Sequence, residues 1–200
     1  MTLLQKIVKR IFDIFISIIA ILTFCPVSLV IAILIKLESQ GPVFFTQTRV
    51  GKDGRDFIIY KFRTMVEGAE HLGAGLEIEK KDPRITVIGA LLRRTSLDEF
   101  PQFINILKGE MSFIGPRPTV PSQVDKYTPR QKRRLEIKPG LTGLAQVSGR
   151  NTLSWAERIE LDIEYIDNYS LLLDMKIFLK TFGVVLFSKD VYGKNGNKGI

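Results

Sequence analysis

The chain has 200 residues, which suits one domain of ordinary size. Although 25% of its residues are charged, 45% are hydrophobic and the mean hydropathy is +0.11, so the apolar residues must be concentrated in one part of the chain. The net charge of +8, from 29 Lys and Arg against 21 Asp and Glu, favours partners that carry phosphate: nucleotide-linked substrates, anionic lipid headgroups or nucleic acid.

The chain contains one cysteine, Cys25, and one histidine, His71. These counts exclude an internal disulfide and a metal site built mainly from cysteine or histidine. A metal ion would therefore be held by carboxylates, which favours Mg²⁺ or Mn²⁺.

An apolar segment covers residues 11–37, with Lys6, Lys9 and Arg10 before it and Lys36 at its end. At about 1.5 Å of rise per residue, a helix of this length could cross a bilayer once. The segment is longer than the apolar region of a signal peptide, and no small-x-small cleavage site follows it. We therefore expect it to be retained as a membrane helix.

Two residues argue against a simple spanning helix. Pro26 lies near the middle of the segment, where its missing N–H and its ring predict a kink. Asp13 lies inside the apolar boundary, at a spacing from Lys9 and Arg10 that would let a helix pair it with either one. Because basic residues flank both ends, the positive-inside rule gives no orientation. A spanning helix and a re-entrant helix, which bends at Pro26 and returns to the same face, both remain open.

The rest of the chain predicts an α+β fold that is mainly helical. Alternating runs, glycine-containing loops and apolar stripes at helical spacing indicate its elements. We expect the last two helices to bury their inner faces in the core and to lie partly in the membrane interface. The predicted elements are a β-hairpin of residues 43–50 and 56–63, helices over 85–94, 98–108, 153–169 and 171–187, a variable segment over 67–83 and a disordered tail over 193–200.

Two adjacent carboxylates, Asp98 and Glu99, lie at a predicted helix start, shortly after Arg93 and Arg94. Ser96 followed by Glu99 fits a capping box, which would give Glu99 a purely structural role. Neighbouring carboxylates repel one another, and a divalent cation shared with a diphosphate, or the two arginines, would relieve that repulsion. A carboxylate can attack phosphorus as a nucleophile. The spacing alone leaves catalysis and capping both open.

Four further basic residues lie at rigid or glycine-rich positions. Lys61 and Arg63 end the second predicted strand, Arg117 lies between two prolines, and Arg150 lies in a glycine-flanked loop. Each one alone is typical of a solvated surface. Together, in a chain with a membrane segment, they favour phosphate recognition.

The chain resembles the bacterial sugar transferases known as monotopic phosphoglycosyl transferases. The resemblance implies a re-entrant helix over residues 1–40 with a proline at its bend, a catalytic domain over 41–190 and a disordered tail over 191–200. It also implies a chain close to the minimal catalytic unit, without the extra membrane helices and domain of larger members. The motifs that carry it are residues 9–13 (KRIFD), 41–45 (GPVFF), 61–65 (KFRTM), 93–102 (RRTSLDEFPQ), 111–118 (MSFIGPRP) and 138–147 (KPGLTGLAQV).

The family resemblance further implies a reaction at the cytoplasmic face of the bacterial inner membrane. A UDP-sugar would give its sugar-1-phosphate to polyprenyl (undecaprenyl) phosphate, with release of UMP, by a ping-pong route. Asp98 would be the nucleophile, Glu99 would assist with magnesium or proton handling, and both would be the metal ligands. The resemblance carries active-site roles onto Lys61, Arg93 and Arg117, and a phosphate contact onto Arg150.

Some features stay open at this point. The sequence does not choose the donor sugar or the glycan pathway, and it leaves open whether two copies form a homodimer. The catalytic interpretation predicts no nucleic-acid partner. The alternative is a non-catalytic membrane-surface binder of nucleic acid or anionic lipid, which would use the basic residues of 130–138.

Overall fold

The computed structural model describes residues 1–69, 82–149 and 152–186. Within these ranges the chain is mainly helical with two small sheets, which confirms the predicted α+β class. The helices are α1 (Leu3–Glu38), α2 (Val87–Thr95), α3 (Gln102–Lys108), α4 (Pro121–Val124), α5 (Pro129–Lys132), α6 (Leu144–Ser148), α7 (Trp155–Asp167) and α8 (Leu171–Leu186). The strands are β1 (Phe44–Val50), β2 (Asp56–Phe62), β3 (Ser112–Ile114) and β4 (Gly140–Thr142). Short 3₁₀ turns include η3 (Leu97–Glu99) and η4 (Arg133–Glu136).

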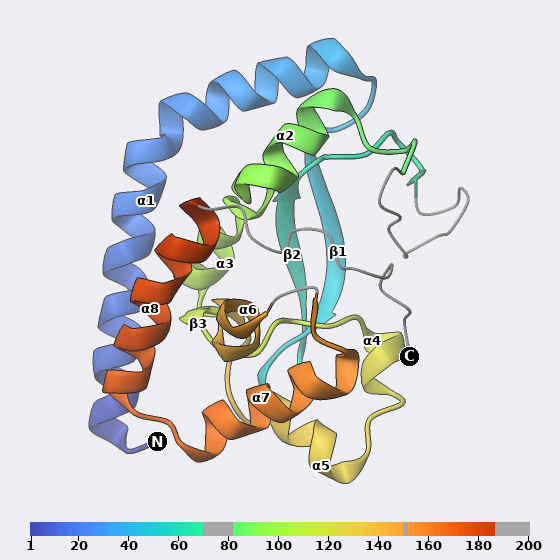
Figure 1. The fold of residues 1–200 in the computed structure, drawn as a ribbon. Helices are drawn as coiled ribbons and strands as arrows, with labels where there is room; N and C mark the ends of the chain where they lie inside the picture. Colours follow the sequence, from blue (N-terminus) through green and yellow to red (C-terminus); the bar gives the residue numbers. More distant parts are fainter. Residues whose placement is uncertain (70–81, 150–151, 187–200) are drawn as a thin grey trace.

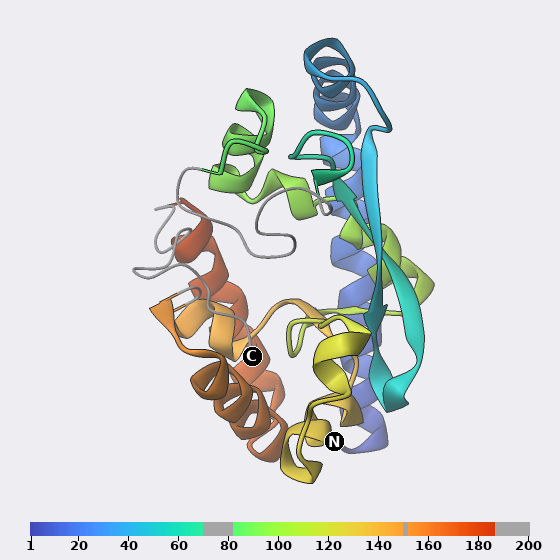
Figure 2. The same cartoon turned by 90° about the vertical axis from the view of Figure 1, so that its right-hand side faces the viewer.

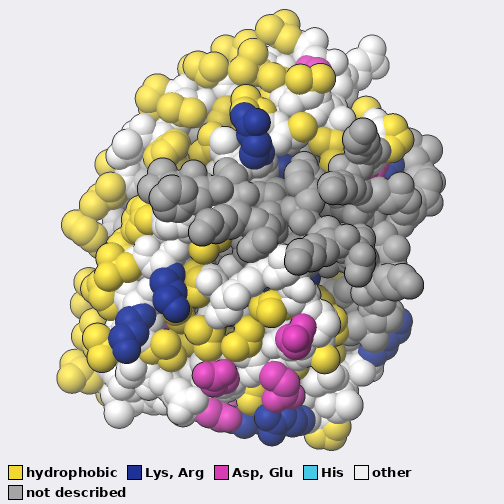
Figure 3. Space-filling view, in the orientation of Figure 1, with side chains coloured by type: hydrophobic (Ala, Val, Ile, Leu, Met, Phe, Trp, Pro, Cys, Tyr) yellow, Lys and Arg dark blue, Asp and Glu magenta, His cyan; other side chains and the backbone are white. Residues whose placement is uncertain are grey.

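Helix α1 runs for 36 residues and contains Pro26. Figure 1 shows its ribbon turning about midway, so that one arm runs beside α8 and the other passes over α2. The predicted bend is therefore confirmed, since proline cannot donate to the preceding turn. Among the described helices, only α1 is long and apolar enough to cross a membrane. Apolar side chains line the outer edge of the molecule over this helix in Figure 3. The exposed apolar residues of α1 include Leu22 and Leu37.

Asp13 joins α1 to β3. Its carboxylate is buried and accepts hydrogen bonds from the backbone N–H of Phe113 (2.8 Å) and the hydroxyl of Ser112 (3.1 Å). The prediction that Asp13 pairs with Lys9 or Arg10 is wrong. Its side chain faces the body of the protein, where buried donors would otherwise lack an acceptor.

Lys9 and Arg10 instead bind other elements. The Lys9 ammonium forms an ion pair with Asp174 of α8 at 2.7 Å. The Arg10 guanidinium donates to the carbonyls of Ile106 (2.6 Å) and Leu107 (2.8 Å) at the end of α3, where helix carbonyls lack intrahelical partners and the dipole favours a cation. The first arm of α1 is thus bonded to α3, β3 and α8.

The hairpin forms as predicted, within one residue at each strand end. Strands β1 and β2 are antiparallel, and Phe45 lies opposite Lys61. Asn105 of α3 holds the outer edge of β2, because its amide accepts from the Tyr60 N–H (3.2 Å) and donates to the Ile58 carbonyl (2.7 Å). The hairpin is therefore fixed directly to α3.

A parallel pairing of β3 with β4, which the sequence did not predict, brings two of the motif loops together. A Cβ at Gly115 would lie 2.5 Å from the Lys138 carbonyl oxygen, and one at Gly140 would lie 2.1 Å from the Gly115 nitrogen. No side chain fits there, so the two glycines allow the loops to touch backbone to backbone.

The predicted helix 153–169 forms as α7, which is two residues shorter at each end, and the predicted helix 171–187 forms as α8 as far as the described residues extend. Figure 2 shows them on the opposite side of the molecule from the hairpin. Between them lies a core that includes a chain of aromatic rings; Phe113 contacts Phe12, Phe103 and Phe178 at centroid distances of 6.3, 6.0 and 5.6 Å. The predictions for the tail over 193–200 and for most of the segment over 67–83 fall outside the described residues.

Candidate functional site

The carboxylate pair lies on the short turn η3 between α2 and α3. Ser96, which precedes η3, has φ 59° and ψ 16° and ends α2, with its N–H directed to the Arg93 carbonyl at 3.3 Å. An N-cap residue must be extended, so a left-handed Ser96 cannot take that role, and its side chain does not cap the turn. The capping-box alternative therefore fails, and the predicted continuous helix over 98–108 is wrong. Asp98 and Glu99 sit on a tight turn, and a separate helix, α3, follows it.

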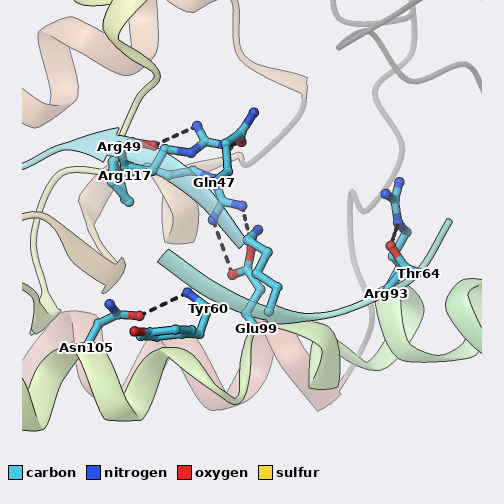
Figure 4. A network of polar contacts seen from close by, with 10 residues as sticks. Gln47, Arg49, Tyr60, Thr64, Arg93, Glu99, Asn105 and Arg117 are labelled. Atoms are coloured by element: carbon cyan, nitrogen blue, oxygen red, sulfur yellow. Dashed lines mark hydrogen bonds and ion pairs between the residues drawn. The ribbon is translucent and has the colours of Figure 1, made fainter. Parts of the chain in front are cut away.

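Glu99 is held by two cations from distant parts of the chain. Its Oε1 accepts from Lys61 Nζ of β2 at 2.7 Å and from Arg117 Nη2 at 2.5 Å, and its Oε2 accepts from Arg117 Nη1 at 3.3 Å. Figure 4 shows Arg117 reaching over the hairpin to this carboxylate. Burial alone would raise the pKa of Glu99, but the charges of Arg117 and Lys61 outweigh it and hold that pKa well below its usual range. Glu99 is an anion at any physiological pH.

In Asp98, the effects that raise the pKa outweigh those that lower it. Burial and the neighbouring Glu99 anion raise its pKa to about 6, while the cations Lys61, Arg93 and Arg117 lower it. The carboxylate is therefore mostly ionised at neutral pH but more basic than an ordinary aspartate. Two adjacent carboxylates with separated pKa values are a pattern typical of catalytic sites.

Arg93 lies on α2, and its Nε donates to the Thr64 hydroxyl at 2.8 Å. Its charge lowers the pKa of Asp98. The close approach of α2 to Thr64 depends on Gly89, where a Cβ would lie 2.0 Å from the Thr64 carbonyl oxygen. Of the basic residues that the sequence singled out, Lys61 and Arg117 contact Glu99, and Arg93 acts on Asp98 through its charge.

Arg63 lies elsewhere. Its buried guanidinium donates to the backbone carbonyls of Ser39 (2.8 Å) and Gln40, just after the end of α1. Those carbonyls need a donor, and Arg63 supplies it, so its contacts tie α1 to the hairpin. Arg150 is outside the described residues.

Two residues of β1, Gln47 and Arg49, belong to this cluster and were missed by the sequence analysis. Arg49 Nη2 donates to Gln47 Oε1 at 2.6 Å, and its Nη1 donates to the Pro118 carbonyl at 3.3 Å. The hairpin register was the signal that could have found them. In that register, Gln47 and Arg49 share the face of Lys61.

The carboxylates of this site offer few ligands for a metal ion. Across the described ranges, no group of three or more His, Cys, Asp or Glu side chains is positioned to hold one. Glu99 is occupied by Lys61 and Arg117, which leaves Asp98 as the available carboxylate ligand. Mg²⁺ commonly binds through one or two carboxylates together with substrate phosphates, and a single aspartate fits that mode.

The basic run over 130–138 is largely neutralised by α7. Three of its arginines form ion pairs, each at 2.6 Å: Arg130 with Glu160, Arg133 with Asp167, and Arg134 with Asp162. A surface built to bind nucleic acid or anionic lipid would leave these guanidinium groups available. The alternative of a non-catalytic binder therefore gains no support from this surface.

Comparisons with known proteins point to one family. Residues 4–188 match the model of the family described as bacterial sugar transferase. The chain is 42% identical over 189 residues to the uncharacterized sugar transferase EpsL of Bacillus subtilis (strain 168), covering 94% of this chain and 92% of that protein. It is 42% identical over 198 residues to the exopolysaccharide production protein ExoY of Rhizobium meliloti (strain 1021), covering 92% and 88%. It is also 45% identical over 185 residues to the UDP-N-acetylgalactosamine-undecaprenyl-phosphate N-acetylgalactosaminephosphotransferase of Aeromonas hydrophila, covering 90% of this chain and 44% of that protein.

The raised pKa of Asp98 predicts that the substitution Asp98→Asn changes the stability of the protein by an amount that depends on pH. An acid whose pKa is raised from 3.8 to about 6 on folding is favoured in its protonated form, so the wild type loses stability as pH rises from about 4 through about 6. Asp98→Asn does not titrate. Its melting temperature should therefore exceed that of the wild type at pH 7.5 by a few degrees, corresponding to roughly 3 kcal/mol at most, and by much less at pH 4.5.

Thermal unfolding in one detergent without divalent cations measures this difference. Asp125→Asn, at an exposed carboxylate on another element, is the matched control and should show no such pH-dependent gap. An Asp98→Asn protein less stable than the wild type at pH 7.5 would contradict the assigned environment of Asp98.

Proposed function

Because the chain belongs to the bacterial sugar transferase family, we propose that it transfers a sugar-1-phosphate from a UDP-sugar to undecaprenyl phosphate and releases UMP. The observation that carries the proposal is the half-buried Asp98, whose pKa is raised, beside an anionic Glu99 and within the field of Lys61, Arg93 and Arg117. The printed name of the Aeromonas relative contains both substrates of such a reaction, and the name of ExoY places that relative in exopolysaccharide production.

In the first half-reaction, an Asp98 carboxylate oxygen attacks the phosphorus that bears the sugar. The new bond joins that oxygen to this phosphorus, and the bond from the phosphorus to the bridging oxygen of the diphosphate breaks. UMP leaves with the bridging oxygen and its electron pair. The product on the enzyme is an aspartyl phosphosugar, an acyl phosphate.

In the second half-reaction, a phosphate oxygen of undecaprenyl phosphate attacks the same phosphorus. The bond between Asp98 and phosphorus breaks, the carboxylate is restored, and an undecaprenyl diphosphate sugar forms. No proton has to be transferred in either step when both nucleophiles are anions. A base with a pKa near 6 is mostly ionised at neutral pH and still more nucleophilic than an ordinary aspartate.

The cations would stabilise the charge that spreads over the transferring phosphoryl oxygens. Lys61 and Arg117 are already aligned by Glu99, so little reorganisation is needed when substrate arrives. Glu99 thus orients cations and keeps the pKa of Asp98 raised. Its two oxygens are occupied, so we assign magnesium binding to Asp98 and the diphosphate instead of to the pair Asp98 and Glu99. The ion, when bound, would neutralise part of the diphosphate charge.

Helix α1 would place this chemistry at a membrane. Its exposed apolar surface suits lipid, its bend lies about midway, and basic residues flank both ends. We propose the re-entrant form, with both ends of α1 on the cytoplasmic face of the inner membrane.

Trapping the intermediate tests the covalent mechanism. With Mg²⁺ and a panel of UDP-sugars but no lipid acceptor, the intact mass of the wild type should rise by one sugar-phosphoryl group for the cognate donor, and the modified peptide should contain Asp98. Asp98→Asn should form no adduct and lose turnover by several orders of magnitude, whereas the control Asp125→Asn should behave as the wild type. Chelation of divalent cations should prevent the adduct. Turnover by Asp98→Asn would contradict the mechanism.

Labelling of single cysteines tests the topology. In a Cys25→Ser background, Gln5→Cys and Gln40→Cys place one thiol near each end of α1. A membrane-impermeant maleimide should label both in inverted vesicles and neither in intact cells whose outer membrane has been permeabilised. Labelling from opposite sides would establish a spanning helix and overturn the re-entrant proposal.

A further inference from the structure

The inner face of the hairpin presents Gln47, Arg49 and Lys61 in a row. Residues directly opposite in an antiparallel pair share a face, and so do residues two apart on one strand. Lys61 lies opposite Phe45, and Gln47 and Arg49 follow Phe45 at alternate positions of β1. Since Lys61 contacts Glu99, the face that carries Gln47 and Arg49 is the face of the active site.

Arg49 is half-buried, and its guanidinium is incompletely partnered. Its Nη2 is oriented by Gln47, its Nη1 makes one long bond to the Pro118 carbonyl, and its Nε is buried without a hydrogen-bond partner. Within the described part of the chain, no Asp or Glu forms an ion pair with it. A buried donor without a partner is costly, so the Nε of this half-buried guanidinium favours the binding of an anion.

The positive charges around Arg49 also lack an unshared anion. Burial and then the positive charge of Arg117 lower the pKa of Arg49 to about 10, and Glu99 opposes that shift. Arg49 and Arg117 therefore repel each other in the substrate-free protein. The charge of Glu99 is already shared by Lys61 and Arg117. A ligand with negative charge on several oxygens would relieve the repulsion and satisfy the free donors.

We propose that Arg49, oriented by Gln47, is a phosphate-binding residue of the substrate site. Its guanidinium would contact a phosphate of the donor diphosphate or the phosphate of the lipid acceptor, next to Arg117. The proposal rests on the proposed function for the identity of these ligands. The anion site itself rests on the contacts and charges of β1 and of residues 117–118.

A purely structural role is the competing explanation, because Arg49 also contacts Pro118. A structural arginine would change the melting temperature of the substrate-free protein and kcat. A phosphate-binding arginine changes the affinity for anions and KM.

Binding of inorganic pyrophosphate to the full-length protein in detergent micelles, measured by calorimetry, tests the anion site without catalysis. Arg49→Gln should weaken binding about tenfold, which corresponds to one charge-assisted hydrogen bond. Arg55→Gln makes the same change at an exposed position after the hairpin turn and should bind as the wild type does. Wild-type affinity in Arg49→Gln, or no pyrophosphate binding by the wild type, would overturn the proposal.

If Arg49→Gln does not fold, Arg49→Lys decides the matter. An ammonium keeps the charge but cannot contact both Gln47 and a phosphate with the planar fork of arginine, so we expect binding weakened about threefold. Unchanged affinity in Arg49→Lys would then overturn the proposal.

Kinetics distinguishes the two phosphate sources. With the acceptor saturating, a raised KM for the UDP-sugar in Arg49→Gln assigns Arg49 to the donor diphosphate. A raised KM for undecaprenyl phosphate alone assigns it to the acceptor. If the wild type releases no UMP from any UDP-sugar, the proposed function fails, while the pyrophosphate measurement still decides whether Arg49 binds anions.

Discussion

The ion pairs of Glu99 with Lys61 and Arg117 are the interaction on which the site depends. They join three segments that are far apart in sequence: the end of β2, the turn η3 and the loop after β3. They also set the chemistry of the neighbouring residue. The Glu99 anion raises the pKa of Asp98, and the two cations keep that pKa from rising further. One carboxylate therefore organises the charges, which leaves the other available as a nucleophile.

Helix α1 supports this arrangement as well as carrying the apolar surface. Phe24 of α1 packs against Phe100, the residue after Glu99, with ring centroids 4.7 Å apart. Asp13 binds β3, and Arg63 binds the carbonyls that follow α1. Because a buried acceptor or donor left unpaired costs about 1–3 kcal/mol, these contacts fix the turn of Asp98 against α1. The position of the carboxylate relative to the exposed apolar surface of α1 thus follows from this packing.

Local pattern predicted the hairpin, the helices α2, α7 and α8, and the bend of α1, because alternation, helical spacing and proline act on neighbouring residues. Side-chain partners depend on tertiary approach, and there the prediction was weaker. Ser96 fits a capping box in sequence but adopts a left-handed conformation between two helices. Arg63 was predicted to recognise phosphate, and Arg49 was not singled out. The hairpin register turns Arg49 toward Glu99, whereas Arg63 reaches the end of α1. The pairing of β3 with β4 is short and joins residues far apart in the sequence, so no periodic pattern in the sequence predicts it.

Isotope exchange tests the central claim most directly, that Asp98 takes the phosphosugar before the lipid takes part. Labelled UMP is incubated with unlabelled UDP-sugar, Mg²⁺ and the full-length protein, without undecaprenyl phosphate. If Asp98 forms the intermediate, the first half-reaction runs in both directions and label appears in the UDP-sugar; Asp98→Asn shows none. Exchange that begins only after undecaprenyl phosphate is added would mean that both substrates must bind together, which contradicts a covalent aspartyl intermediate.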